Sequence, residues 1–120
     1  GYSSDASWLS SVMREVNLPN CGTLPDFGNF TTNLFPYKIY DRYQGMKELM
    51  PFAKGVSAKS HDFNEAGEDL NTDFKRVLQT VKDAGYTGFV GVEYEGDELN
   101  ESKGIKATKD LLLSVATKLK

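Results

Sequence analysis

The sequence predicts an α/β protein in which helices and strands alternate in the order α-β-α-β-α-β-α, with three parallel strands. Four stretches repeat apolar residues at the three- and four-residue spacing of an amphipathic helix. Three shorter strand candidates lie between them, of which residues 53–59 are weak by composition, and no hairpin signal joins any two of these. Because strands that alternate with helices pair in parallel, all three strands are expected to end at one edge of the sheet.

The predicted helices are bounded by capping residues, prolines and a glycine. Pro19 blocks continuation of the first helix, Pro51 limits the second, and Gly85 is the expected C-terminal residue after the third. The last helix has the apolar stripe from Ile105 to Leu119. The expected N-caps are Ser3, Ser4 or Asp5 for the first helix, Asp41 with Gln44 as a capping box for the second, and Asn71 or Thr72 for the third.

Each predicted strand ends in a group of polar residues. The strands are expected within residues 22–26, 53–59 and 89–96, although Pro25 is awkward for a central strand. The polar groups are Asp26 with Asn29, Lys59 with His61 and Asp62, and Glu93 with Glu95. Ligand and catalytic sites of parallel sheets lie at the carboxyl ends of the strands, so the three groups are expected to face one site.

Asp26, His61 and Glu93 are two carboxylates and one imidazole, which are ligand types for Mn²⁺, Mg²⁺, Co²⁺ or Zn²⁺. Each of these side chains also has a plainer interpretation. His61 is equally consistent with a solvated loop histidine, and Asp26 with an Asx-turn ahead of Gly28. Glu93 can simply face solvent at the end of its strand, and Lys59 can either hold a substrate anion or extend its charge to water.

Composition indicates one soluble domain. The chain has 120 residues, 39% of them hydrophobic and 26% charged, and a net charge of −3. An acidic chain without a basic stripe is not expected to bind nucleic acid, and no apolar run reaches the length of about 18 residues that a membrane span needs. The single Cys21 excludes an internal disulfide and is expected to be a small buried thiol. These features favour a cytoplasmic protein.

Four sequence words carry a resemblance to a known family over nearly the whole chain. They are LPDFGNF (24–30), AKGVSAKSHDF (53–63), DAGYTGFVGVEYEG (83–96) and GIKATKDLL (104–112). In this order they resemble the C-terminal half of the sugar isomerase/epimerase superfamily, the xylose-isomerase-like (β/α)₈ TIM barrels related to the tagatose 3-epimerase and endonuclease IV families. The resemblance implies that residues 1–120 form a single partial domain, equivalent to helix 5 through helix 8 of such a barrel.

The resemblance also implies a metal site. In that superfamily a Glu, an Asp, a His and a second Glu hold one divalent metal at the mouth of the barrel, and Asp26, His61 and Glu93 match the last three. The match of His61 departs from the family pattern, in which the histidine lies two residues before a lysine. That register falls on Ser57, which is not a metal ligand, so His61 would bind from a shifted position or serve the substrate.

A half-barrel would need a partner. A complete barrel needs about 250 residues, and the strand that would carry the first Glu ligand is absent from this chain. Three parallel strands also leave two unpaired edges. We therefore expect a missing N-terminal half-barrel, or self-association, to complete the fold.

The function implied by the resemblance is that of a divalent-metal-dependent isomerase or epimerase of a sugar or sugar phosphate. Such an enzyme transfers a proton through a metal-stabilised enediolate. Glu93 would be one proton-transferring carboxylate, while Asn29, Lys59, Asp62 and Glu95 would orient the substrate. Two alternatives remain: a catalytically inactive half-barrel that self-associates, and an endonuclease IV-like repair enzyme, which the acidic charge and single histidine disfavour.

Overall fold

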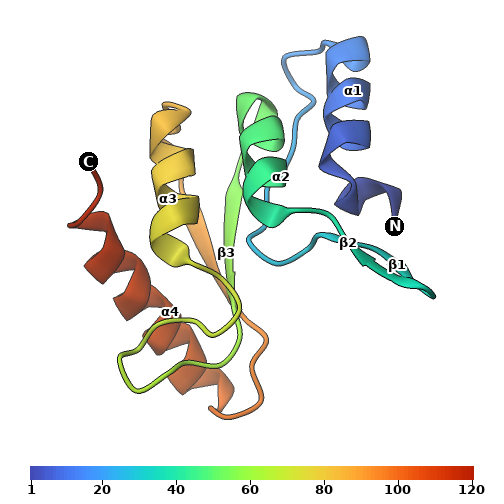
Figure 1. Cartoon of the computed structure of the whole chain (residues 1–120). Coiled ribbons are helices and arrows are strands. Elements are labelled where there is room, and N and C mark those ends of the chain that lie inside the picture. Colours follow the sequence, from blue (N-terminus) through green and yellow to red (C-terminus); the bar gives the residue numbers. More distant parts are fainter.

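The computed structural model describes all residues from 1 to 120 and contains four α-helices and two separate two-stranded sheets (Figure 1). The helices are α1 (Ala6–Val16), α2 (Arg42–Leu49), α3 (Phe74–Asp83) and α4 (Glu101–Ala116). The strands are β1 (Thr31–Leu34), β2 (Tyr37–Ile39), β3 (Val56–Ser60) and β4 (Val90–Tyr94). Two single 3₁₀ turns, Tyr2–Ser4 and Met50–Phe52, precede α1 and follow α2.

The predicted half of a TIM barrel with three parallel strands is wrong. Only β3 and β4 pair in parallel, and β1 and β2 form an antiparallel hairpin. Residues 22–26, predicted as the first strand, form only two isolated bridges. Asp26 pairs with Ser57 in β3, and Thr23 pairs with Ala53, which precedes β3. The step from Ala53 to Ser57 is one residue longer than the step from Thr23 to Asp26, and this mismatch prevents a continuous ladder.

The β1–β2 hairpin lies in the segment where the sequence predicted neither a strand nor a turn. Its two strands are joined by Phe35 and Pro36, a pair without the Asn-Gly or Asp-Gly preference of common two-residue turns. The hairpin projects from the body of the molecule beside the N-terminus (Figure 1). Its side chains are largely exposed, including Leu34, Phe35 and Tyr37.

All four helices begin at a side-chain cap. Asp5 and Asp41 cap α1 and α2 as predicted, and Asn100 caps α4. The cap of α3 is Asp73, one residue after the predicted Thr72. The reason is that the Asp69 carboxylate already accepts hydrogen bonds from the backbone N–H groups of residues 71 and 72, so the helix starts after this turn.

α4 contacts both β3 and β4, α3 packs between α4 and α2, and α1 packs on α2. In Figure 1, α1, α2 and α3 stand side by side, while α4 lies across the lower part of the molecule beside α3. The buried core joins Phe27 from the loop after residue 26, Met46 from α2, Ala58 from β3 and Val77 from α3. None of the helices combines the length and the apolar character needed to cross a membrane.

Cys21 lies in the segment between α1 and the site residues and is exposed. The expectation of a small buried thiol is therefore wrong. α1 ends at the left-handed residue Asn17, and the chain passes through Pro19 before it becomes buried again at Thr23, whose hydroxyl donates to the Leu49 carbonyl oxygen. The local sequence around Cys21 has no periodic pattern from which its exposure could be predicted.

Candidate functional site

The parallel register of β3 and β4 brings polar side chains from both strands together. Lys59 lies opposite Glu93 in the register, and Ser57 lies opposite Gly91. Residues 26 to 29 approach the same place, because Asp26 bridges to Ser57 and the Ser57 carbonyl oxygen accepts a hydrogen bond from the N–H of Phe27. Residues from all three predicted strand ends therefore meet, namely Asp26 with Asn29, Lys59, and Glu93 with Glu95, although the segment that ends at Asp26 is not a strand.

Lys59 is the centre of this arrangement, which we call the Lys59 cluster: Asp26, Asn29, Ser57, Lys59, Glu93 and Glu95. Its side chain is only 5% exposed. The ammonium group lies 3.1 Å from Glu93 Oε1 and 2.9 Å from Glu95 Oε1, and it donates to Asn29 Oδ1 at 3.0 Å. An ammonium group has three N–H donors, so these three oxygens satisfy it completely.

Both oxygens of the Glu93 carboxylate are held by β3. Ser57 Oγ donates to Glu93 Oε2 at 2.8 Å while Lys59 contacts Oε1. Desolvation acts to raise the pKa of Glu93, but the hydrogen bonds from Ser57 and Lys59 and the charge of Lys59 outweigh it and lower the pKa below its ordinary value. Glu93 is thus a carboxylate at neutral pH, and with 43% of its side chain exposed it is accessible to a ligand.

The pKa of Lys59 is shifted by the same contacts in the opposite direction. Burial acts to lower this pKa, but the hydrogen bonds to Glu95 and Glu93, together with the nearby charge of Asp26, raise it above its ordinary value. Lys59 is therefore a fixed positive charge in the cluster. It is not an amine that can act as a base at neutral pH.

Asp26 is buried beside the cluster and has one oxygen without a partner. Its Oδ1 accepts hydrogen bonds from the backbone N–H groups of Gly28 and Asn29 at 2.8 and 2.9 Å, which is the Asx-turn that the sequence indicates. Its Oδ2 is buried and has no hydrogen-bond partner, and the residue is 8% exposed. A buried carboxylate oxygen without a partner is costly, and the Asp26 carboxyl also lies close enough to Glu93 to lower the pKa of Glu93.

His61 and Asp62 follow β3 but do not join the hydrogen bonds of the Lys59 cluster. The backbone N–H of His61 donates to Asp69 Oδ2, and the His61 Nδ1 atom is buried without a partner. Asp62 Oδ1 accepts from the N–H groups of Asp97 and Glu98 and so orders the loop between β4 and α4. The structure contains no group of three or more His, Cys, Asp or Glu residues arranged to hold a metal ion.

Two residues of the site region escaped the sequence interpretation. The resemblance places Ser57 where a metal-binding histidine is expected and gives it no role, yet the Ser57 hydroxyl fixes the Glu93 carboxylate. The alternation of side chains along a strand places Ser57 and Lys59 on the same face, and this was the available signal. Arg42 donates from Nη1 to the carbonyl oxygen of Phe27 and to Thr72 Oγ1, and thereby holds the loop that follows Asp26. Nothing in the sequence around Arg42 indicates these contacts.

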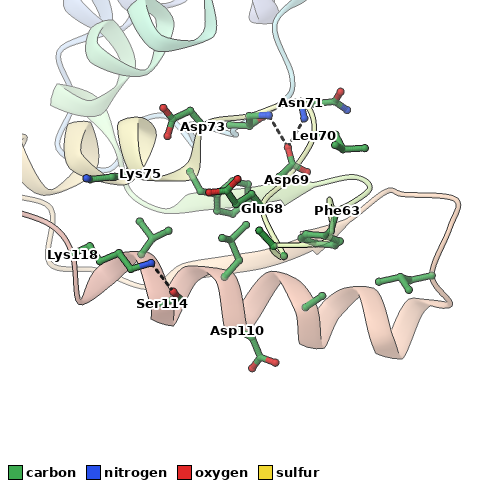
Figure 2. A pocket seen from close by; sticks show the side chains of 18 of the residues that line it. Phe63, Glu68, Asp69, Leu70, Asn71, Asp73, Lys75, Asp110, Ser114 and Lys118 are labelled. Carbon is green, nitrogen blue, oxygen red and sulfur yellow. Dashed lines mark hydrogen bonds between the residues drawn. The ribbon is translucent and has the colours of Figure 1, made fainter.

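A separate cleft of about 950 Å³ lies between α4 and the loop that follows β3 (Figure 2). Phe63 and Leu111 contribute apolar surface, and Asp69, Asp73 and Lys118 contribute charge. The Asp69 and Asp73 carboxylates are engaged in backbone hydrogen bonds that shape the loop and cap α3. Because no residue of the Lys59 cluster lines this cleft, we do not place the candidate site there.

Comparison with known proteins identifies a partial similarity to a carbohydrate-processing enzyme subunit. No family model matches the chain. The chain is 32% identical over 57 residues to the 3'-dehydrocarminate deglycosidase alpha subunit of Microbacterium sp. The match covers 48% of this chain and 16% of the length of that protein. It agrees with a relation to sugar-processing enzymes and gives no assignment to the isomerase/epimerase superfamily, which stays a prediction.

Proposed function

We propose that this chain is part of a carbohydrate-processing enzyme in which Glu93 exchanges a proton with a carbon atom next to a sugar carbonyl. The observation that carries the proposal is the geometry of Glu93. Its carboxylate is fixed by Ser57 and Lys59, ionised at neutral pH and half-exposed at the carboxyl end of β4. A positioned carboxylate of this kind is suited to general acid–base catalysis. The similarity to a deglycosidase subunit supports a sugar as substrate.

A divalent cation is part of this proposal. Asp26 Oδ2 lacks a partner, and the carboxyl of Asp26 is close enough to affect the pKa of Glu93. Two carboxylates with water in the remaining positions suit Mg²⁺ or Mn²⁺, so Asp26 and Glu93 are the residues that would hold the ion. Bound there, the ion would polarise the substrate carbonyl. His61 as a further ligand stays a prediction, because its ring is not grouped with these carboxylates.

The other residues of the cluster have proposed roles in binding. Asn29 and Glu95 hold the ammonium of Lys59 and present their remaining polar atoms at the carboxyl ends of the strands. Asn29 and Glu95 are suited to orient sugar hydroxyl groups by hydrogen bonds, and Lys59 holds both of them in place with its three N–H donors. Asp62 would support substrate binding indirectly, because its carboxylate orders the loop that follows β4 and begins at Glu95.

A second carboxylate is needed to return a proton to the opposite face of a sugar carbon. We propose that it comes from a partner, either a further polypeptide segment or a second copy of the chain. The free edge of β4 supports this, because β4 pairs only with β3. A non-catalytic, self-associating chain is the second candidate, favoured by the ion pairs in which the Lys59 ammonium engages both Glu93 and Glu95.

The experiment that tests the catalytic proposal is hydrogen exchange in D₂O. The chain is incubated with Mg²⁺ and D-fructose, and deuterium incorporation next to the carbonyl is followed by proton NMR. We expect incorporation above the protein-free rate, its loss in Glu93→Gln, and its retention in Glu65→Gln, which removes the same charge at an exposed position outside the cluster. The proposed activity would be contradicted if deuterium incorporation were equally fast with and without the protein. It would also be contradicted if Glu93→Gln exchanged as fast as the unaltered chain.

A further inference from the structure

The exposed surface of the Lys59 cluster offers many hydrogen-bond acceptors and few donors. The Glu93 and Glu95 side chains are about half-exposed, and each carboxylate has lone pairs beyond those that Lys59 uses. Lys59 itself has no donor left for a ligand, because its three N–H groups are directed to Glu93, Glu95 and Asn29. Asn29 is exposed and keeps the N–H groups of its Nδ2 atom as donors. A ligand that donates several hydrogen bonds therefore suits this surface.

The backbone N–H groups near the cluster are already bound by carboxylates of the chain itself. In α/β proteins, N–H groups of the loops that follow the strands commonly bind phosphate. Here Asp26 Oδ1 accepts from the N–H groups of residues 28 and 29 at 2.8 and 2.9 Å. Asp62 Oδ1 accepts from the N–H groups of residues 97 and 98, both at 3.0 Å. Two internal carboxylates thus occupy the positions that a bound phosphate would take.

The charge of the cluster also opposes an anion. It contains the carboxylates of Asp26, Glu93 and Glu95 but one ammonium group, so it is negative overall. Arg42 does not offset this charge at the cluster, because its Nη1 atom donates to the Phe27 carbonyl oxygen and to Thr72 Oγ1. A phosphate ester carries a charge of about −1.5 to −2 at neutral pH and has oxygen atoms that accept hydrogen bonds. It would meet like charge and no free N–H of Lys59.

We infer that the Lys59 cluster selects an uncharged sugar and rejects the phosphate esters of sugars. This inference rests on the proposed function, which has a sugar as its substrate, and it names the class of sugar. A sugar hydroxyl group can donate to an exposed carboxylate oxygen of Glu95 and accept from the Asn29 amide, whereas an ionised phosphate can only accept. None of these contacts involves a metal ion, so the preference should persist when divalent cations are removed.

The test compares the binding of D-fructose and of D-fructose 6-phosphate to the chain in the presence of EDTA. Proton–nitrogen correlation NMR follows the backbone amide signals of Gly28 and Asn29, which lie beside the cluster. We expect a dissociation constant about tenfold larger for the phosphate ester at low ionic strength, because like charges oppose its binding. Added salt should narrow the difference, since it screens this repulsion.

A charge variant connects the preference to the cluster. Glu95→Gln removes one exposed negative charge and should reduce the ratio of the two dissociation constants by about threefold. Glu65→Gln makes the same change at an exposed position outside the cluster and should leave the ratio unaltered. Equal or tighter binding of the phosphate ester, amide signals that respond to neither sugar, or the same effect of both variants would overturn the inference.

The same measurements separate this inference from the proposed activity. Tighter binding of D-fructose without any deuterium exchange into it would leave the inference standing and refute the activity. Tighter binding of the phosphate ester, together with exchange into D-fructose that Glu93→Gln abolishes, would overturn the inference and leave the activity standing.

Discussion

Ser60 and Thr108 form a hydroxyl pair in the interior, directly behind the Lys59 cluster. Both residues are fully buried, their oxygen atoms share a hydrogen bond, and Thr108 Oγ1 also donates to the Gly104 carbonyl oxygen. Ser60 further contacts the carbonyl oxygen of Glu93 at 3.3 Å. The pair therefore connects α4 to the backbone of both β3 and β4, through polar atoms that have no access to water.

Replacement of Thr108 by Val removes this connection without changing the shape of the side chain. We expect Thr108→Val to lower the free energy of unfolding by about 1 to 3 kcal/mol, because a buried Ser60 hydroxyl loses its best partner. Urea denaturation measures the change. Thr80→Val is the matched control: Thr80 makes the same hydrogen bond to a carbonyl four residues earlier, but at an exposed site, and its loss should cost much less. Equal costs for the two variants would contradict this account.

Tyr40 provides a pH dependence at the scale of one residue. Its hydroxyl donates to Glu48 Oε2 at 2.8 Å, and this bond, with burial and the Glu48 charge, raises the pKa of Tyr40 to about 12. The folded state therefore holds the phenol proton more tightly than the unfolded state. The resulting stability is fully present below the ordinary pKa of 10.0 and is lost as the pH rises toward about 12.

We expect Tyr40→Phe to remove this alkaline loss. The measurement is the free energy of unfolding at a series of pH values from about 9 to about 12. This range covers the ordinary pKa of tyrosine, 10.0, and the raised pKa of Tyr40, about 12. The unaltered chain should lose stability more steeply than Tyr40→Phe over this range. Tyr37→Phe alters an exposed tyrosine and should retain the steep loss. Parallel curves for the unaltered chain and Tyr40→Phe would show that Tyr40 does not contribute.

Residue types predicted part of the candidate site. The Asx-turn of Asp26 could be anticipated, because aspartate followed by Gly28 has a local hydrogen-bond partner within two residues. The roles of Ser57 and Lys59 could not be anticipated in the same way. They depend on Glu93, which lies 36 residues after Ser57 and meets it only through the pairing of β3 with β4.

At the scale of elements, α2 illustrates how a glycine can be required inside a helix. A Cβ atom at Gly45 would overlap Phe30 Cε1, so the ring of Phe30 packs directly on the helix backbone. Phe30 is buried and immediately precedes β1. The absence of a side chain at Gly45 thus fixes the start of the hairpin against α2.

The consequence is a reversal of the usual effect of alanine. Gly→Ala in an exposed helix stabilises by about 1 kcal/mol, but we expect Gly45→Ala to destabilise by about 1 to 3 kcal/mol because it overpacks Phe30. Thermal or urea unfolding measures this. Ser102→Ala at an exposed position of α4 should change stability by less than about 0.5 kcal/mol. A more stable Gly45→Ala variant would disprove the packing argument.

The helices could be predicted from the sequence and the β1–β2 hairpin could not. Apolar periodicity and capping residues are local signals, and they located all four helices to within a few residues. The hairpin turn at Phe35 and Pro36 lacks the usual turn residues, so its strands looked irregular. The strand predicted for residues 22–26 is wrong for a different reason. The composition of this segment suits a strand, but composition does not ensure a matching hydrogen-bond register with β3.

At the scale of the whole molecule, the β3–β4 pair has an open edge. No strand pairs with the outer side of β4, and the adjoining Phe89 is 96% exposed. No charged side chain precedes Glu93 along this edge to discourage the addition of another strand. The prediction of self-association or of a missing partner, made from the sequence, therefore acquires a definite location, and it stays a prediction.

We expect the average mass of the chain to rise with concentration in sedimentation velocity, and Phe89→Lys to suppress the rise. A lysine at the edge of a sheet opposes strand addition by charge repulsion between copies. Leu18→Lys introduces the same charge at another exposed apolar residue and should not suppress the association. A chain that stays monomeric at all concentrations, or an equal effect of both variants, would contradict this prediction.

The overall topology was predictable only where elements alternate without interruption. The sequence from β3 through α3 to β4 follows the expected alternation, and these strands are parallel as predicted. Before β3 the alternation fails, because the hairpin is inserted between the first polar group and α2. The predicted half-barrel extended the strand–helix alternation to the residues before β3, where the structure does not follow it.

The parallel pairing of β3 and β4 also determines when the Lys59 cluster forms during folding. Ser57 and Glu93, which are 36 positions apart, cannot meet until the chain between them, which includes α3, has closed into a loop. Closing a loop of this length costs chain entropy before the strands gain any contact, so parallel pairing of this kind is slow. The cluster is therefore completed late, and a substitution that only delays the docking of α3 would delay the assembly of the site without altering any of its residues.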